Sequence, residues 1–263
     1  MELAAITREE FSSKTWRRPS NYAFAALSNL LPAVIGELAK LVPALPLGFV
    51  KTGDSFQLVA ITSLQPGINH FVAPDGNWIG EYIPATVRAY PFQLVKPQDR
   101  EESVLCIDTS SGLLVEAGPG EAFFDGEEPT QAIKDIVNLL SETEQSRVVT
   151  QRLVDSLQAA ELIQPWSLNL RQGEQTVPVE GLFRIDETAM NVLPDDNFLA
   201  LRKAGALVLA YGQLFSMNQL SVLPKAAEVG ARIGAQLQAK ASSQAVSADI
   251  GFLFPKGETI KFS

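Results

Sequence analysis

The sequence contains a single cysteine, Cys106, and a single histidine, His70. One cysteine excludes an intramolecular disulfide bond and any zinc site built from several thiolates. A Ser-His-Asp triad, a Cys-His dyad or a histidine-rich metal site would each have to use His70. We therefore expect no metal site, and the sequence offers few groups for nucleophilic catalysis.

The motifs that bind nucleotides or activate serine nucleophiles are also missing. The sequence has no Gly-x-Gly-x-x-Gly, no Gly-x-x-x-x-Gly-Lys-Ser/Thr and no Gly-x-Ser-x-Gly pattern, so no nucleotide or other cofactor is expected. A dyad of Cys106 and His70 is one alternative, because both residues fall on predicted strands. A cysteine in the apolar run Val104–Ile107 is more often a small buried hydrophobic residue. We favour that interpretation, with His70 at a sheet edge.

Basic charge is scarce, with 21 lysines and arginines against 30 acidic residues and a net charge of −9. Such a field repels nucleic-acid phosphates and anionic membrane surfaces. The run Trp16-Arg17-Arg18 is the densest basic segment, and we interpret it as solvated surface. No nucleic-acid partner is expected.

Long uncharged apolar runs are absent too. The longest apolar-leaning stretch, Tyr22–Val50, is interrupted by prolines, Glu37 and Lys40, so it cannot supply the ~20 residues of a membrane-spanning helix. The segment Met1–Phe11 lacks the basic and apolar regions of a secretory signal. We therefore expect a cytoplasmic protein with no membrane insertion.

Turn signals and periodicity in the first half predict strands and one long helix. Pro32–Leu41 has the spacing of a short helix, and Leu45–Val50 with Ser55–Ile61 reads as a hairpin. A further strand is expected at His70–Val72, reversing through Pro74–Asn77 towards Trp78. Strands are also predicted at Phe92–Val95 and Val104–Ile107, followed by a surface loop at Gly112–Pro129 that is anchored by Phe123-Phe124. An amphipathic helix is predicted at Thr130–Leu162, either as one helix or as two joined near Ser141–Glu144, and Pro165 ends it.

The second half predicts another hairpin, Trp166–Leu170 with Thr176–Phe183, and then helices at Asp186–Leu193, Asp195–Lys203 and Ala204–Phe215. Strands followed by helices indicate the α+β class: antiparallel hairpins forming a mixed sheet, packed by the long helix and the C-terminal helices. We expect one domain over residues 1–224. Residues 225–263 are expected to form an appendage, with a helix at Ala226–Ala241 and strands at Ile250–Phe254 and Thr259–Phe262.

The segment from Tyr82 to Phe92 combines aromatic rings with an arginine. A planar cation such as Arg88 between the phenols of Tyr82 and Tyr90 can hold a carboxylate, a phosphate or a sugar. The alternative, which we weight more heavily, is that the rings fill the core while Arg88 pairs with a buried carboxylate such as Asp108.

Several blocks of the sequence together resemble the SapC-like family of proteobacterial proteins, over roughly Trp16 to Leu223. The residues that carry the resemblance are Asn69–Trp78, Tyr82-Ile83-Pro84, Arg88, Tyr90-Pro91-Phe92, Leu105–Asp108, Gly181-Leu182-Phe183, Asp186-Glu187, Leu201–Leu207 and Tyr211. The resemblance implies a role in surface-layer or cell-envelope biology. It also implies an accessory part in uptake or modification of a substrate, because similar proteins are found near outer-membrane receptors and halogenase-like flavoproteins.

Two functions follow as hypotheses. The first is a non-catalytic binding or accessory protein for a peptide, a sugar or another anionic small molecule, with a protein partner or a homodimer formed through the C-terminal tail. The alternative is an enzyme, or the partner of one, that modifies a peptide or small molecule in a Tyr/Arg/Asp pocket. The candidate ligand-binding residues are Tyr82, Arg88, Tyr90, Asp108, His70 and Trp78.

Overall fold

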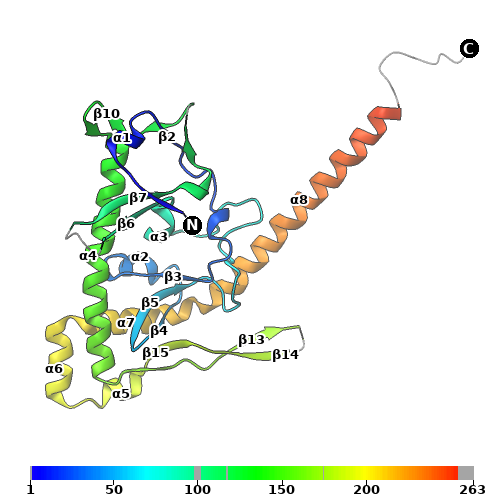
Figure 1. The fold of residues 1–263 in the computed structure, drawn as a ribbon. Coiled ribbons are helices and arrows are strands. Elements are labelled where there is room, and N and C mark those ends of the chain that lie inside the picture. Colours follow the sequence, from blue (N-terminus) through cyan, green and yellow to red (C-terminus); the bar gives the residue numbers. More distant parts are fainter. Residues whose placement is uncertain (1, 98–101, 117, 174, 254–263) are drawn as a thin grey trace, which may run out of the picture.

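The computed structural model describes residues 2–97, 102–116, 118–173 and 175–253 (Figure 1). It confirms the α+β class, with small antiparallel sheets, a long helix and helices towards the C-terminus. Every strand pair among these residues is antiparallel, and the strands divide into several sheets that pack along the long helix.

The largest sheet has the strand order β12-β15-β4-β5-β3. Its strands are β3 (Leu30–Pro32), β4 (Leu47–Thr52), β5 (Ser55–Ile61), β12 (Ile163–Pro165) and β15 (Leu182–Ile185). The predicted β4–β5 hairpin is confirmed, and its turn places Gly53 at a φ of +62°, which glycine adopts without strain.

The predicted helix at Pro32–Leu41 begins later than expected. Pro32 belongs to β3, and helical structure starts with the 3-10 turn η2 (Ile35–Glu37), followed by α2 (Leu38–Leu41). Since β3 lies at the end of the sheet order, Pro32 needs no ladder hydrogen bond on its outer side. An edge strand therefore accommodates the proline that we assigned to a helix start.

The second sheet has the order β1-β7-β6 and confirms the predicted strands around Phe92 and Cys106. The strands here and beside it are β1 (Leu3–Ala5), β6 (Phe92–Val95), β7 (Val104–Asp108), β2 (Thr15–Trp16), β8 (Leu114–Val115), β9 (Glu121–Ala122), β10 (Phe124–Asp125) and β11 (Glu128–Pro129). Short helical turns join them: α1 (Arg8–Phe11), η1 (Ala23–Ala25), α3 (Ala85–Arg88) and η3 (Thr109–Ser111). The predicted surface loop thus carries short strands, and its apolar anchor is confirmed because Phe123 is fully buried.

The predicted strand at His70–Val72 is wrong. One isolated bridge joins Val72 to Trp78, and the backbone N–H of Phe71 is taken by the side chain of Asn69 at 2.9 Å. A side chain that satisfies the backbone locally competes with a strand ladder. The predicted reversal after it is confirmed, with Asp75 accepting from the Asn77 N–H at 3.0 Å.

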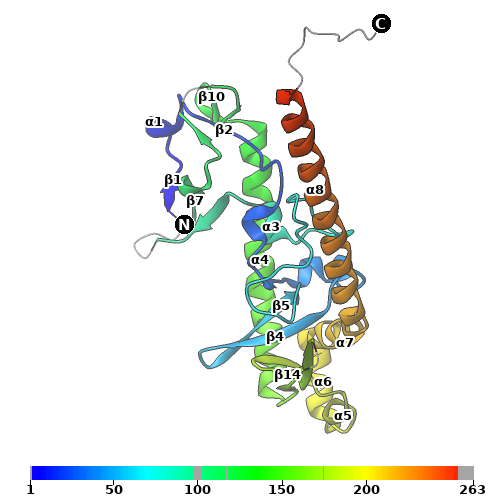
Figure 2. The same ribbon diagram turned by 90° about the vertical axis from the view of Figure 1, so that its right-hand side faces the viewer.

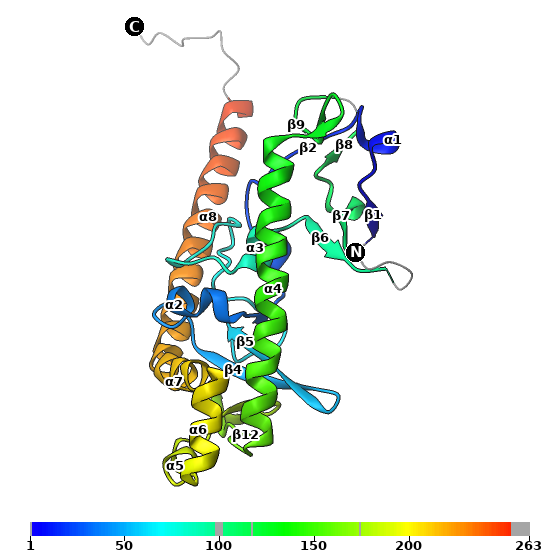
Figure 3. The same cartoon turned by 90° about the vertical axis from the view of Figure 1, so that its left-hand side faces the viewer.

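Helix α4 (Gln131–Ala159) is one continuous helix of 29 residues, about 43 Å long. Its N-terminal end contributes Ile133 to a core with Phe11, Trp16 and Phe123. Its C-terminal end contributes Leu157 to the larger core beneath the main sheet. Helix α4 therefore contributes side chains to both cores. Figure 3 shows it running along the body of the protein. It ends before Pro165, which lies in β12.

The hairpin and the helices after α4 follow the predicted order. They are the hairpin β13 (Leu168–Gln172) with β14 (Gln175–Val179), α5 (Glu187–Asn191), α6 (Asp195–Ala204), α7 (Ala206–Ser216), η4 (Met217–Ser221) and α8 (Val222–Leu253). The predicted strand Thr176–Phe183, however, is two strands, β14 and β15, that belong to different sheets. Asp186 caps α5 through a hydrogen bond from the Ala189 N–H, as expected for an acidic residue at a helix start.

The C-terminal segment differs from the prediction. Residues 250–253 continue α8 instead of starting a strand, in keeping with the alanine-rich and glutamine-rich composition that precedes them. The predicted strand at Thr259–Phe262 lies outside the described residues. The domain boundary at residue 224 falls inside α8 and stays a prediction. Figures 1 and 2 show α8 running past the body of the protein and extending away from it.

One helical stretch, Ala206–Ser242, has the length and composition of a membrane-spanning helix. Within its apolar window 39% is buried inside the protein. The core helix of a soluble protein meets the same criterion, so the expectation of no membrane insertion stays a prediction.

The side chain of Gln213 on α7 joins two strands of the main sheet where their backbones diverge. Its Oε1 accepts from the N–H of Ile185 in β15 at 2.9 Å, and its Nε2 donates to the carbonyl of Leu47 in β4 at 3.0 Å. Ser216, one turn later, accepts from the Leu47 N–H at 2.9 Å. Helix α7 thus completes the hydrogen bonding of the sheet that it covers.

Replacing Gln213 with Leu should destabilise the fold by about 2–5 kcal/mol, because it leaves the Ile185 N–H and the Leu47 carbonyl buried and unpaired. Urea unfolding monitored by circular dichroism measures this change. Gln175→Leu on the exposed hairpin is the matched control and should shift stability by less than about 0.5 kcal/mol. Equal effects of the two substitutions would contradict the bridging role.

Candidate functional site

The polar centre of the protein is a buried carboxylate that the sequence did not single out, Glu37 at the end of η2. The residue is 7% exposed, and its Oε1 accepts from the phenol of Tyr82 at 2.5 Å and from the N–H of Ala85 at 2.7 Å. The guanidinium of Arg88 lies 3.6 Å from the same oxygen. The other oxygen, Oε2, has no partner among the described residues.

Tyr82 and Arg88 therefore meet, as the clamp hypothesis expected, but they meet around Glu37. The Nη2 of Arg88 is 3.4 Å from the Tyr82 hydroxyl, and the Nε of Arg88 donates to the carbonyl of Ile83 at 3.0 Å. Burial, reinforced by the Glu37 carboxylate, raises the pKa of Tyr82 to about 12. Tyr82 is therefore a neutral hydrogen-bond donor at physiological pH.

Trp78 holds the backbone of Tyr82 in place. Its indole Nε1 donates to the carbonyl of Tyr82 at 3.0 Å, and its ring packs against Tyr22 and Phe71 at centroid distances of 6.0 and 5.8 Å. Because its polar atom is already used, Trp78 positions the Tyr82 segment.

Arg88 and Tyr90 line a pocket of about 190 Å³ between the segment 16–22 and α3. Tyr90 stacks on Phe24, with ring centroids 3.8 Å apart and an interplanar angle of 13°. Burial, and then the Asp108 carboxylate, raise the pKa of Tyr90. Two of the predicted residues, Arg88 and Tyr90, thus line one pocket, whereas Tyr82 is not among its lining residues.

The pocket also contains two residues that sequence reasoning assigned to plain surface, Trp16 and Arg18. Trp16 is 2% exposed, and its Nε1–H has no acceptor among the described residues. Arg18 lies over the Trp16 ring at 5.5 Å and binds Glu121 through two nitrogens, at 2.6 and 3.0 Å. The run Trp16-Arg17-Arg18 was a usable signal, because an arginine near a tryptophan can lie over its ring as a cation–π pair, as Arg18 does here.

Arg88 pairs with a buried carboxylate, as the preferred sequence interpretation expected, but that carboxylate is Glu37 and not Asp108. The Asp108 carboxylate accepts from the Glu2 N–H at 3.0 Å and from the Ser110 hydroxyl at 2.6 Å. Burial alone would raise the pKa of Asp108, but these hydrogen bonds lower it overall. Arg88 found Glu37 instead because α3 lies directly beside that carboxylate.

His70 lies apart from the other candidates, in a groove between residues 68–74 and α8. Its Nε2 is 3.1 Å from the Ser63 hydroxyl, and burial lowers the pKa of His70. Cys106 is buried in β7, and burial raises the pKa of its thiol. The alternative dyad assumed that both residues share a sheet, and His70 belongs to no strand.

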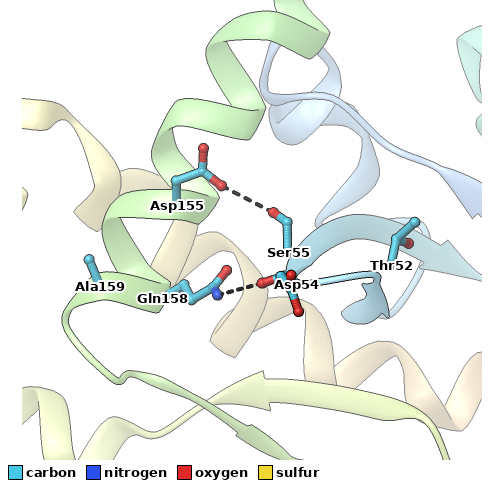
Figure 4. Close-up of a pocket in the computed structure, with 6 residues that line it drawn as sticks. All are labelled: Thr52, Asp54, Ser55, Asp155, Gln158 and Ala159. Atoms are coloured by element: carbon cyan, nitrogen blue, oxygen red, sulfur yellow. Dashed lines mark hydrogen bonds between the residues drawn. The ribbon is translucent and has the colours of Figure 1, made fainter.

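A larger hollow of about 420 Å³ lies between the β4–β5 turn and α4 (Figure 4). Its polar groups bind one another: the Ser55 hydroxyl donates to Asp155 at 3.2 Å, and Gln158 donates to the Asp54 carbonyl at 2.8 Å. These contacts fasten the hairpin to α4. We therefore locate the candidate site at the Arg88 pocket, where the Trp16 indole N–H has no acceptor among the described residues.

Fold and pocket together define an α+β protein with a small aromatic pocket that contains arginines. No group of three or more His, Cys, Asp and Glu side chains that could hold a metal occurs among the described residues. The SapC family model matches residues 6–223, so the chain belongs to the SapC family. No curated protein and no solved structure matches the chain.

Replacing Glu37 with Gln should lower the pKa of Tyr82 from about 12 while leaving it above 10, because burial still acts on the phenol. Ultraviolet titration of tyrosinate, with Tyr82→Phe to identify the transition, measures the change.

The raised pKa of Tyr82 stabilises the fold below pH 10, and this stabilisation is lost as the pH rises through about 12. Tyr82→Phe should therefore flatten the alkaline stability profile, and Tyr211→Phe on α7 should not.

Proposed function

We propose that this SapC-family protein is a non-catalytic binding or accessory protein that receives an anionic group of a peptide, sugar or small molecule in the Arg88 pocket. The observation that carries the proposal is that Trp16 lines a pocket together with two arginines, and that its buried indole N–H has no acceptor among the described residues. A buried donor without a partner costs about 1–3 kcal/mol. A ligand oxygen that accepts from it recovers that free energy.

The charges around the pocket favour a ligand that accepts hydrogen bonds and carries little negative charge. Arg18 is held by Glu121 and Arg88 by Glu37, so each cation is already neutralised on one side. The Nη1 of each arginine makes no hydrogen bond with the described residues. A single carboxylate, or the ring hydroxyls of a sugar acid, matches two such donors together with an indole N–H.

The volume supports a small bound group. Sites for drug-sized ligands measure about 300–1,000 Å³, and this pocket measures about 190 Å³. The aromatic rings of Tyr22 and Tyr90 provide flat walls for an apolar or sugar face. A side chain or a chain end of a larger molecule fits this description better than a complete cofactor does.

The proposed biological setting is cell-envelope or surface-layer biology, or the uptake of a substrate, as implied by the resemblance to SapC-like proteins. We place the protein in the cytoplasm, because a single cysteine is typical of chains in a reducing compartment. The enzymatic alternative used Tyr, Arg and Asp groups in one pocket. Because Arg88 pairs with Glu37 while Asp108 accepts hydrogen bonds from Glu2 and Ser110, binding is the function that this geometry favours.

N-acetylglutamate, glucuronate and inorganic phosphate are suitable probes for this site. We expect at least one carboxylate probe to shift the Trp16 indole N–H resonance in two-dimensional NMR and to bind in calorimetry. Removing the arginine and its buried counter-charge together, as Glu37→Gln/Arg88→Ala, avoids an unpaired buried carboxylate. This variant should bind about 10-fold to 100-fold more weakly, the equivalent of a charge-assisted hydrogen bond.

Arg147→Ala is the matched control, because Arg147 pairs with Glu144 on the surface of α4 and is not among the residues that line the pocket. It should leave the affinity unchanged. Native mass spectrometry of protein purified from its host complements the probes by weighing any retained ligand. Binding that is unaffected in both Trp16→Phe and the double variant would place the site elsewhere.

A further inference from the structure

Exposed apolar side chains gather on the helices at one end of the molecule, away from the proposed pocket. Val208, Tyr211 and Phe215 are 62%, 37% and 63% exposed, and their spacing on α7 places them on one face. The rings of Tyr211 and Phe215 stack with centroids 6.2 Å apart. Helix α7 has no charged residue along its length. Contiguous exposed apolar surface of this kind marks interaction sites.

A groove of about 550 Å³ adjoins this face, with walls from α5, α6 and α7. Asp195, Leu199 and Arg202 of α6 all line it, together with Tyr211 of α7. These α6 residues occur at positions i, i+4 and i+7, so they form one stripe that reads acidic, apolar, basic. Figures 1 and 3 place α6 at the outer edge of the molecule.

The charged side chains at the two ends of the stripe are not paired with other described residues. Neither Asp195 nor Arg202 makes a side-chain hydrogen bond or an ion pair with any residue that the structure describes. They are separated by seven residues, about 10 Å along the helix. Acidic residues at a helix start and basic residues at its end stabilise the helix dipole, which explains their order but not the apolar groove between them.

We propose that this surface binds a second copy of the same chain across a two-fold axis, with α6 antiparallel to α6 of the partner. In such an isologous contact, a residue and its counterpart exchange places. Asp195 of each copy then faces Arg202 of the other, and the axis passes between Phe198 and Leu199. The apolar faces of the two α7 helices are covered at the same time.

The net charge makes this surface the favourable one for self-association. Each copy carries −9, so most surfaces that approach one another bring together like charges, which costs free energy on association. The α7 face is uncharged, and the α6 stripe is balanced. Exposed ion pairs contribute only about 0–1 kcal/mol each, so the apolar contact provides the affinity and the two ion pairs fix the register.

Sedimentation velocity over a range of concentrations tests the proposal on the full chain. We expect a reversible dimer that Phe215→Ser dissociates. Asp195→Arg and Arg202→Asp should each weaken the dimer about 10-fold or more, because the axis turns every reversal into two repulsive contacts. Circular dichroism checks that the helices persist in each variant. Asp125→Arg, on exposed β10, is the matched charge control and should leave the dimer unchanged.

Exchanging the charges of Asp195 and Arg202 provides the most specific test of the two-fold contact. The double variant Asp195→Arg/Arg202→Asp restores both ion pairs and should dimerise again. An equimolar mixture of the two single variants should form mixed dimers, detected by native mass spectrometry, while each variant alone is largely monomeric. A chain that is monomeric at all concentrations, or a dimer indifferent to these reversals, would overturn the proposal. Loss of the dimer on deleting residues 254–263 would also overturn it and assign the contact to the C-terminal tail.

Discussion

The buried carboxylate of Glu37 is the constraint on which the proposed site depends. A carboxylate in the interior is tolerated only when hydrogen bonds and a counter-charge surround it. Glu37 obtains these from the Tyr82 hydroxyl, the Ala85 N–H and Arg88, all from one segment that lies outside the main sheet. By satisfying Glu37, the chain fixes α3 against the core and holds Arg88 at the pocket wall.

The pocket and the main sheet belong to different parts of the packing, and α4 keeps them in a fixed relation. Phe92 and Trp16 belong to the smaller core at the N-terminal end of α4, whereas Glu37 lies beside the larger core at its other end. Trp16 meets Phe92 edge to face at 4.8 Å. The Arg88 pocket is lined by Trp16, Phe92 and Ile136 of the smaller core and by Tyr22 and Val87 of a third hydrophobic cluster, so it lies between these two groups.

The sequence predicted the elements more fully than it predicted their partners. The hairpins, the long helix and the acidic starts of α5 and α6 follow from local periodicity and turn residues, which act within a few positions. The errors have different causes. The helix expected at Pro32 was overridden by pairing with a strand distant in sequence, the strand at His70 by the nearby side chain of Asn69, and the strand at Ile250 by the continuation of α8.

The candidate site shows the same division. The sequence by itself determined that Tyr82, Arg88 and Tyr90 form a polar aromatic segment, and that the cysteine and histidine content excludes many reactions. Only the tertiary structure decided that Arg88 pairs with Glu37 instead of Asp108, and that Trp16 and Arg18 join the pocket. The reason is physical: these contacts depend on distances between residues that lie 45 to 103 positions apart in the sequence, and local composition carries no record of those distances.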